Sequence, residues 1–443
     1  MRPRWIGFFS PARLLILSLL SMIPIATLLL ALPICRTTSI AFGDLLFTAI
    51  SYTTITGLSV IPLSSFSFIG HLVILCLIQV GGIGVITLTF FLVSFFVDFG
   101  IAAQIFGARI LSLDSWKDTG EIIFFIIKIT FFIELIGALI IFASIYQDYS
   151  WGYGIFLSIF HAVSAFVSAG LVLFPNGLSS YHNNYLLLFI LSLLMIAGEI
   201  GFMIWHELIE YIYTVRKHGR FHFSLHTKVV FFSTISITGT SFLLYWMLER
   251  CNTLHHLSFV GVGVNALFNA VAARGTGFIT LPLLDLQLAT LLLIMILTFI
   301  GASPGSTGSG IKTTSLTILS GMIKAASAGR FITIIRGRTI PQIQVCQAIT
   351  IISLSIGWVL CILFFLLITE HATFLELLFE VVSAFGNCGL SMGVTTTLSS
   401  FGKVCIALTM MVGRVGCLAT MLAFIKKPIH IEYSYPEERI MLG

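Results

Sequence analysis

The chain has 443 residues, of which 58% are hydrophobic and only 9% are charged. A water-soluble domain carries about 25% charged residues, so this chain lacks the charge to cover a soluble surface and most of its outside must face lipid. This composition excludes soluble enzymes, disordered chains and nucleic-acid binders. In a membrane protein, the excess of 23 basic over 18 acidic residues bears first on topology.

Eight long apolar runs predict membrane-spanning helices. They cover residues 14–34, 68–97, 122–146, 185–209, 228–248, 286–325, 343–369 and 401–425. The first run follows Arg2, Arg4 and Arg13, as the apolar part of a signal peptide would. Its length of about 20 residues nevertheless favours a spanning helix.

Four shorter apolar stretches lie between alternate pairs of these runs, at 40–53, 153–167, 256–273 and 373–386. They are too short to cross a bilayer of about 30 Å, so each predicts a re-entrant helix. Each stretch ends in small or polar residues, a glycine, and then Leu or Phe. The four glycines, Gly57, Gly170, Gly277 and Gly389, are 113, 107 and 112 residues apart.

This spacing predicts an all-α polytopic membrane protein made of four pseudo-repeats around one central pore. Each repeat consists of a span, a re-entrant pore helix, a filter turn and a second span. The predicted boundaries are 1–100 with filter 54–58, 101–215 with filter 168–171, 216–325 with filter 275–278, 326–425 with filter 387–390, and a cytoplasmic tail at 426–443.

Basic residues predict the orientation of the spans. The segments 1–13, 99–120, 210–228, 324–341 and 426–443 hold 16 of the 23 Lys and Arg residues. The segments on the opposite side hold only Arg36, Arg250 and Lys403. By the positive-inside rule, both termini are cytoplasmic and the four re-entrant segments enter the membrane from outside.

The four glycine turns predict a cation filter. Irregular backbone at membrane depth is tolerated where it lines a water-filled path, and its carbonyl oxygens replace the hydration shell of a cation. The predicted filter residues, acting through their backbones, are Thr54, Ile55, Thr56 and Gly57; Ser168, Ala169 and Gly170; Gly275, Thr276 and Gly277; and Asn387, Cys388 and Gly389. The turns hold no carboxylate, which favours a monovalent cation. The alternative is that the glycines are helix-packing contacts.

A glycine-rich segment at 301–312 interrupts the sixth apolar run and predicts an intramembrane gate loop. Its candidate gate residues are Gly301, Ser303, Pro304, Gly305, Ser306, Thr307, Gly308, Gly310 and Lys312. The segment looks like a Walker A loop, but Lys312 comes two residues after Gly310 and no strand precedes it, which argues against nucleotide binding. An inert kink is the other alternative.

Three charged residues within or beside the apolar runs are functional candidates, because a charge at the centre of a spanning helix costs about 3 kcal/mol. Arg414 in the last run is expected to face the pore, repel cations and interact with the gate loop. A structural pairing is its alternative role. Arg274 is expected to brace the third filter turn, while Glu199 interrupts the fourth run without an evident partner.

The sequence resembles the Trk/Ktr/HKT superfamily of potassium transporters along essentially its whole length, and most closely the bacterial Ktr-type membrane subunit. The motifs that carry the resemblance are Thr54–Leu58, Gln79–Gly84, Leu225–Lys228, Ser303–Thr307, Gly310–Thr314, Ser383–Gly393 and Gly413–Gly416, with Tyr435–Glu438 and Gly443 in the tail. Three positions depart from the family pattern: the second filter at 168–171, the third filter at Gly275 and Thr276, and Glu199 in place of a common glycine.

The resemblance implies potassium uptake across the bacterial inner membrane by a homodimer, in contact with membrane lipid and under the control of a cytoplasmic nucleotide-binding regulatory ring (KtrA-like). Potassium is the implied substrate, with sodium possible, and no covalently bound cofactor and no nucleic acid are expected. Whether uptake is symport with sodium or protons, or is driven by membrane potential alone, stays open. The alternative to a non-enzymatic transporter is a polytopic membrane enzyme such as a lipid-modifying transferase. The scattered ionisable residues disfavour that alternative.

Overall fold

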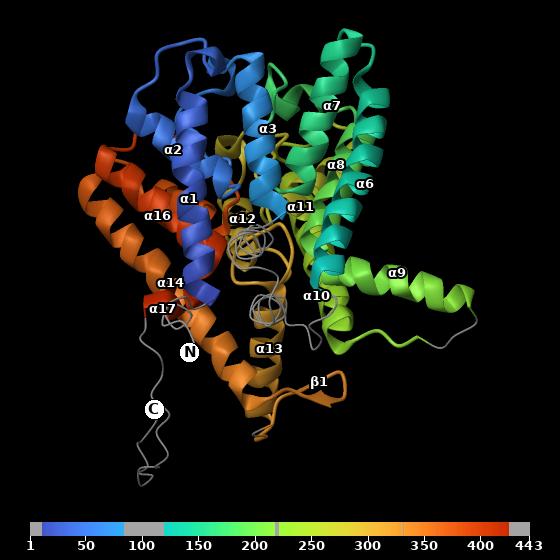
Figure 1. Ribbon diagram of the computed structural model, residues 1–443. Coiled ribbons are helices and arrows are strands. Elements are labelled where there is room, and N and C mark those ends of the chain that lie inside the picture. Colours follow the sequence, from blue (N-terminus) through green and yellow to red (C-terminus); the bar gives the residue numbers. More distant parts are fainter. Residues whose placement is uncertain (1–10, 84–118, 218–220, 331, 425–443) are drawn as a thin grey trace, which may run out of the picture.

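The computed structural model describes residues 11–83, 119–217, 221–330 and 332–424, and these are mostly helical (Figure 1). Residues 84–97 of the second predicted span, the basic segment at 99–118 and the tail at 426–443 lie outside the described residues.

The order of elements along the chain is the same four times over: a first helix, a short helix, a turn and a second helix. The first helices are α1 (Pro11–Ala31), α6 (Thr119–Ile145), α10 (Leu225–Glu249) and α14 (Gln342–Thr369). The short helices are α2 (Phe42–Thr53), α7 (Trp151–Phe166), α11 (Phe259–Ala272) and α15 (Phe374–Gly386). The second helices are α3 (Phe68–Ile83), α8 (Tyr185–Ile200), α12 (Leu288–Ile300) and α16 (Ser400–Val415).

The remaining elements connect or extend these helices. They are α9 (Phe202–Arg216), α13 (Thr313–Ser327), α17 (Cys417–Phe424), the 3₁₀ turns η2 (Pro33–Cys35), η3 (Leu63–Ser65), η4 (Gly177–Tyr181), η5 (Leu283–Asp285) and η6 (Val394–Thr396), and the strands β1 (Ile334–Ile335) and β2 (Arg338–Thr339). The two strands form an antiparallel hairpin with Ile334 opposite Thr339.

Two of the second helices end earlier than the hydropathy predicts. The continuous helix expected over 185–209 stops at Gly201, whose φ of 107° is outside the helical range, and α9 leaves α8 at an angle of 96° (Figure 1). The continuous helix expected over 401–425 is likewise interrupted at Gly416, with φ of 92°. Both breaks occur at glycine because only glycine adopts these backbone angles without strain.

Among the described residues, three helices are long and apolar enough to span a membrane, and the bent pair α8–α9 adds a fourth candidate. They are Ile123–Ile145, Leu225–Glu249 and Gln342–Thr369. Their outer faces carry large exposed apolar side chains, for example Phe132 and Leu139 on α6 and Phe364 on α14. Such surface is stable in lipid and would be costly in water.

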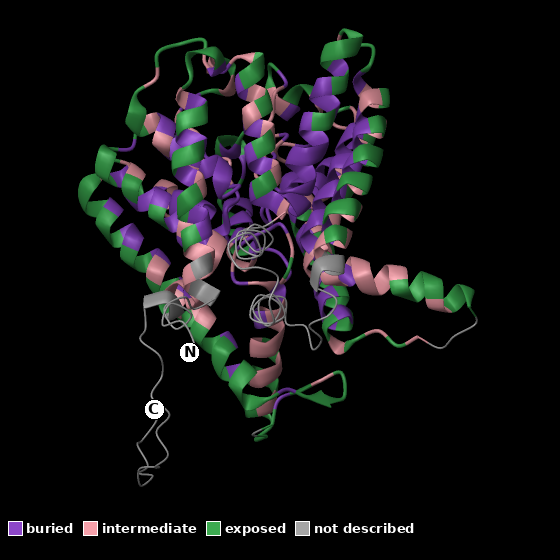
Figure 2. Ribbon diagram, in the orientation of Figure 1, coloured by how far each residue is buried: buried purple, intermediate pink, exposed green. Residues whose placement is uncertain are grey.

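The short helices are buried mainly toward their C-terminal ends, and Figure 2 shows buried residues gathered in the middle of the bundle. Local sequence defines their ends. Thr373 and Glu376 form a capping box at the start of α15, and Ser258 caps α11. At the other end of α15, Asn387 adopts left-handed angles, which asparagine tolerates better than most residues.

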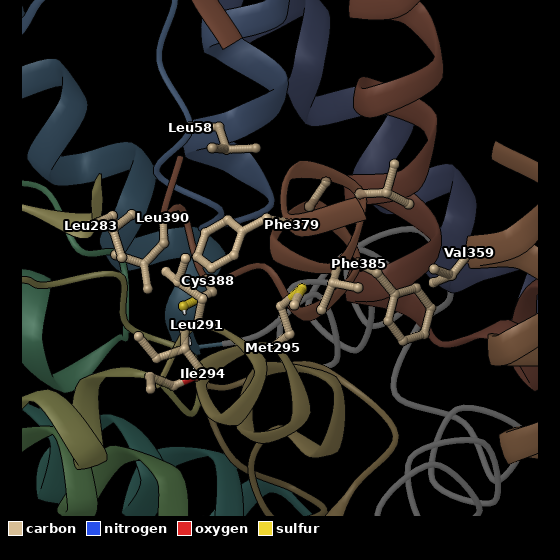
Figure 3. Packing of buried hydrophobic residues seen from close by; sticks show 14 of the residues in the cluster. Leu58, Leu283, Leu291, Ile294, Met295, Val359, Phe379, Phe385, Cys388 and Leu390 are labelled. Atoms are coloured by element: carbon tan, nitrogen blue, oxygen red, sulfur yellow. Dashed lines mark hydrogen bonds between the residues drawn. The ribbon is translucent and has the colours of Figure 1, made fainter. Parts of the chain in front are cut away.

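Apolar packing fixes the short helices in place. In Figure 3, Phe379 and Phe385 of α15 lie in one hydrophobic cluster with Leu291 and Met295 of α12. Leu58, the residue after Gly57, belongs to the same cluster. The residues that flank the first and fourth turns are therefore anchored in a well-packed core, which restricts the movement of the turns between them.

Candidate filter and gate

Each of the four predicted filter turns contains a glycine in the left-handed region. The φ angles are 82° at Gly57, 66° at Gly170, 71° at Gly277 and 85° at Gly389. The turns follow directly on the C-terminal ends of α2, α7, α11 and α15. A side chain at any of these positions would strain the backbone, because L-residues with φ above zero are disfavoured.

The structure brings the four turns together in a closed cycle. A Cβ atom built on Gly57 would lie 2.4 Å from the carbonyl oxygen of Ala169 in the second turn. The same construction gives 1.9 Å from Gly170 to Thr276 O, 1.9 Å from Gly277 to Cys388 O and 2.2 Å from Gly389 to Thr56 O. Each turn thus touches the next and the fourth touches the first, so all four surround one axis.

The third turn is built differently from the other three. In the first, second and fourth turns, the residue two before the glycine also has positive φ: 59° at Ile55, 63° at Ser168 and 51° at Asn387. The peptide N–H of the next residue then donates to the carbonyl oxygen five residues before it, as Thr56 N does to Ser51 O at 2.8 Å.

In the third turn, Thr276 N donates to the carbonyl oxygen only four residues before it, that of Ala272, at 3.0 Å. The sequence carries a matching signal, because Phe268 precedes Gly277 by nine residues whereas the equivalent spacing in the other repeats is ten. The third repeat therefore lacks one residue of the turn and avoids a left-handed non-glycine residue, which costs roughly 1–2 kcal/mol.

A second set of contacts supports the cycle from behind. The carbonyl four residues before each filter glycine touches the second helix of its own repeat. A Cβ atom on Gly81 would lie 2.7 Å from Thr53 O, on Gly198 it would lie 1.9 Å from Phe166 O, and on Gly413 it would lie 2.0 Å from Phe385 O. In the third repeat, the Thr298 hydroxyl instead donates to Ala273 O at 2.7 Å.

Sequence reasoning missed this supporting set, although its signal was present. A glycine or a threonine stands near the middle of each second apolar run. The close approach of backbone to backbone explains why a small residue is needed there.

Side chains link the turns as well. The Asn387 amide donates to Thr56 Oγ1 at 2.6 Å and to Thr54 O at 3.2 Å, so it joins the fourth turn to the first. It also donates to Met410 O at 3.1 Å. By contrast, Ser168 Oγ and Thr276 Oγ1 are buried and have no hydrogen-bond partner among the described residues. The side-chain oxygens of the second and third turns are thus not used in holding the cycle together.

The predicted gate segment at 301–312 is a loop that closes on itself. Ala302 N donates to Ser309 O at 3.2 Å, and Lys312 N donates to Ile300 O at 3.0 Å. Gly301, Gly305 and Gly310 all have positive φ. Inside the loop, Lys312 Nζ donates to Gly308 O at 2.6 Å and Ser306 Oγ donates to Ser303 O at 2.5 Å. The Lys312 ammonium is therefore used within the loop, and nothing in this arrangement resembles a phosphate cradle.

The loop docks against the break between α8 and α9. Ser303 N donates to Glu199 O at 3.2 Å, Thr307 N donates to Gly198 O at 3.2 Å, and Phe202 N donates to Gly305 O at 2.9 Å. Pro304 O lies beside Gly201. The Thr307 hydroxyl also donates to Phe166 O at 3.1 Å, the carbonyl that supports the second filter turn. The loop is thus in direct contact with the base of the second turn.

Arg414 ties this loop to another helix. Its Nη1 donates to Thr307 O and its Nη2 donates to Gly81 O, both at 2.5 Å. Gly81 is the residue that supports the first filter turn. The expected contact of Arg414 with the gate loop is therefore present, and the guanidinium bridges the loop, α3 and the end of α16.

Glu199 has a partner that the sequence did not suggest. Its Oε2 lies 3.4 Å from Nη1 of Arg274, and both side chains are completely buried. Arg274 Nη1 also donates to Thr238 Oγ1 at 3.2 Å. Since Arg274 lies next to the third turn and the Glu199 backbone holds the gate loop, the pair connects these two parts of the site.

We expect Glu199→Gln to destabilise the folded protein strongly. It leaves the Arg274 charge buried and unpaired, and breaking a buried ion pair in this way costs about 3–5 kcal/mol. The measurement is the thermal unfolding midpoint in detergent. Glu210→Gln, which removes an exposed carboxylate on α9, is the control and should change the stability by less than about 1 kcal/mol. A double variant Glu199→Gln/Arg274→Gln no more stable than the single variant would contradict the pairing.

Comparison with known proteins shows the family of this chain. The model of the TrkH family, described as "Cation transport protein", matches residues 15–430. The Ktr system potassium uptake protein B of Bacillus subtilis (strain 168) is 34% identical over 445 residues, covering 99% of this chain and 98% of that protein. The potassium/sodium uptake protein NtpJ of Enterococcus hirae is 33% identical over 446 residues, covering 98% of this chain and 97% of its own length.

A solved structure has the same fold. The potassium transporter TrkH from Vibrio parahaemolyticus superposes with a TM-score of 0.75 at 18% identity, covering 94% of this chain and 85% of that one. This likeness identifies the fold as that of an all-α polytopic membrane protein. Taken with the family match over residues 15–430, it leaves no support for the enzyme alternative, and the chain belongs to the TrkH family of cation transport proteins.

Proposed function

We propose that this chain carries potassium, and sodium less well, through the axis enclosed by the four glycine turns. The observation that carries the proposal is the closed cycle of backbone contacts from Gly57 through Gly170 and Gly277 to Gly389 and back. Four carbonyl-bearing turns around one axis are suited to replacing the water shell of a dehydrated cation.

The electrostatics of the short helices support the same reading. The C-terminal ends of α2, α7, α11 and α15 all lead into the turns, and each helix end carries about half a negative charge on its unpaired carbonyls. Four such ends favour a cation and disfavour an anion. The turns themselves contain no carboxylate, so they lack the charge that a divalent cation prefers.

The loop at 301–312 is proposed as the gate of this path. It hydrogen-bonds the base of the second turn through Thr307 and is held by Arg414. The loop is rich in glycine and short polar residues, so a change in its backbone costs little side-chain packing. Displacing it would therefore open the path without unfolding the surrounding helices.

Shortening the loop across Gly305–Gly310 is expected to raise the cation flux about tenfold, because the docking bonds of Ser303 to Glu199 and of Thr307 to Gly198 are lost or misaligned. The measurement is the initial rate of rubidium uptake into proteoliposomes. Shortening the exposed β1–β2 hairpin by the same number of residues is the control. Equal or lower flux in well-folded loop-shortened protein would rule out a gating role for this segment.

The relatives support a proposal about the partner of this protein. The Bacillus subtilis relative is named as one protein of a Ktr system, which supports a partner subunit for this chain, proposed to be a cytoplasmic nucleotide-binding ring. We further propose a location in the bacterial inner membrane with both termini in the cytoplasm, on the strength of the basic segments on one side of the spans. A homodimer is proposed because the resemblance to the Ktr-type membrane subunit implies one.

The decisive experiment is a potassium, rubidium and sodium flux series in proteoliposomes, with and without a regulatory ring. The proposal expects saturable flux in the order potassium, rubidium, sodium. Absence of any cation flux from folded protein, or equal rates for all three ions and for a large organic cation, would overturn it.

A further inference from the structure

One position recurs behind all four turns. Each short helix carries an aromatic residue nine or ten positions before its filter glycine, and the next residue is polar. These polar residues are Thr48, His161, Asn269 and Glu380, and all four are buried.

In three repeats this polar side chain binds the segment that follows its own filter glycine. Leu173 N donates to His161 Nε2 at 3.2 Å, and Thr280 N donates to Asn269 Oδ1 at 3.3 Å. In the fourth repeat, Ser391 Oγ donates to Glu380 Oε2 at 2.7 Å, and the Thr395 hydroxyl donates to Oε1. Thr48 differs, because it bonds the carbonyl of Asp44 within its own helix at 2.7 Å. The shared task of the three is to hold the chain just beyond the glycine.

Only the fourth repeat performs this task with a carboxylate. His161 Nδ1 bonds Leu157 O at 2.7 Å while its Nε2 accepts from Leu173, which is the pattern of a neutral imidazole. Asn269 is neutral by nature. Glu380 is completely buried, and among the described residues no Lys, Arg or His lies within ion-pair distance of it.

Two hydroxyl groups donate to the Glu380 carboxylate, but no basic side chain among the described residues compensates the charge that it carries when ionised. A buried charge without a partner is costly, and buried charged groups are paired with an opposite charge or coordinate a metal ion. Ser391, which binds the carboxylate, is only two residues after Gly389. A cation held at the fourth turn would supply the compensating charge.

We propose that Glu380 determines the affinity of the filter for cations. Its charge strengthens cation binding at that end of the filter where the residues after the glycines lie. Its hydrogen bonds position Ser391 and Thr395. The inference rests on the proposed passage of cations through the four turns. It assigns a specific role to one repeat, because the other three have neutral groups at the same place.

The test measures the KM for potassium in rubidium-uptake competition assays with proteoliposomes. Glu380→Gln keeps the volume and one acceptor oxygen but removes the charge, and we expect the KM to rise roughly tenfold while kcat changes less than about twofold. Glu376→Gln, at a half-buried position in the first turn of the same helix and compatible with its capping box, is the control and should leave both constants unchanged.

A gain-of-charge variant makes the test independent of whether Glu380→Gln folds. Asn269→Asp adds a carboxylate at the matching place in the third repeat and retains an acceptor for Thr280 N, so we expect the KM to fall several-fold, by roughly threefold or more. An unchanged KM in Asn269→Asp or in folded Glu380→Gln would overturn the charge assignment. So would an equal rise in Thr395→Val, which removes a hydroxyl and keeps the charge. Absence of flux from the unmodified protein would instead overturn the proposed function itself.

Discussion

Replacing Gly57 with serine should lower the preference for potassium over sodium by on the order of tenfold, which corresponds to about 1.4 kcal/mol. A Cβ atom at this position would lie 2.4 Å from the carbonyl oxygen of Ala169, closer than atoms approach without displacement. The φ of 82° adds backbone strain for any L-residue. The carbonyl of the second turn must therefore move, and the spacing of the oxygens around the axis changes.

Gly57 is the best of the four glycines for this experiment. The built Cβ atoms at Gly170 and Gly277 lie only 1.9 Å from a neighbouring carbonyl oxygen, so substitution there is expected to disrupt the cycle rather than adjust it. At Gly57 and Gly389 the distances are 2.4 and 2.2 Å. Serine at Gly57 thus has the smallest displacement to accommodate, and folded protein with altered selectivity is the expected product.

The measurement is the ratio of potassium to sodium competition against rubidium uptake in proteoliposomes. Gly43→Ser is a matched control, because Gly43 lies in the same short helix and a Cβ atom built on it meets nothing within 4 Å. Unchanged selectivity in the Gly57 variant, with unfolding behaviour like that of the control, would remove this turn from the filter.

The short helices show what sequence reasoning reaches well. The helix predicted at 373–386 is α15 over Phe374–Gly386, and the helix predicted at 40–53 is α2 over Phe42–Thr53. The reason is that both signals are local: an apolar run with a helix start such as the Thr373 capping box, followed by a glycine that cannot continue the helix. The spacing between the aromatic residue and the glycine, which is one residue shorter in the third repeat, likewise indicates that the third turn has a different conformation.

The breaks at Gly201 and Gly416 could not be read in the same way. The apolar pattern continues past both residues, and glycine also occurs inside regular helices, as Gly137 does in α6. What distinguishes Gly201 is a distant segment, since the peptide groups around it bond the loop at 301–312. Hydropathy reports how much of a helix prefers lipid, but it does not report which backbone groups find partners elsewhere.

The sequence could not predict the long-range pairs in the site for a similar reason. Glu199 and Arg274 are 75 residues apart, and Arg414 bonds a carbonyl 333 residues away at Gly81. A single sequence shows that a buried charge needs a partner without showing which one. The order of the turns around the axis, and the glycines that support them from the second helices, depend on the same tertiary information.

Arg414→Ala should raise the cation flux roughly tenfold to a hundredfold in the absence of any regulatory partner. The guanidinium donates to Thr307 O of the loop and Gly81 O of α3, and a hydrogen bond with a charged donor is worth about 1.5–3 kcal/mol. A bond that exists only when the loop is docked stabilises the closed state relative to the open state. Losing it therefore shifts the equilibrium between docked and displaced loop toward the displaced state by that energy. Removing the positive charge also removes a repulsion of cations beside the path.

Two further variants separate these contributions in the same rubidium-uptake assay. Arg414→Lys keeps the charge but not the two-pronged bonding geometry, so we expect a smaller rise than with alanine. Lys403→Ala removes a basic side chain from the other end of α16, where it pairs with Asp44 on the surface at 2.7 Å, and should leave the flux unchanged. If Arg414→Lys and Arg414→Ala raise flux equally, the hydrogen bonds rather than the charge hold the loop. If neither raises it in folded protein, Arg414 is a structural brace, because a residue that keeps a gate shut must increase flux when its bonds are removed.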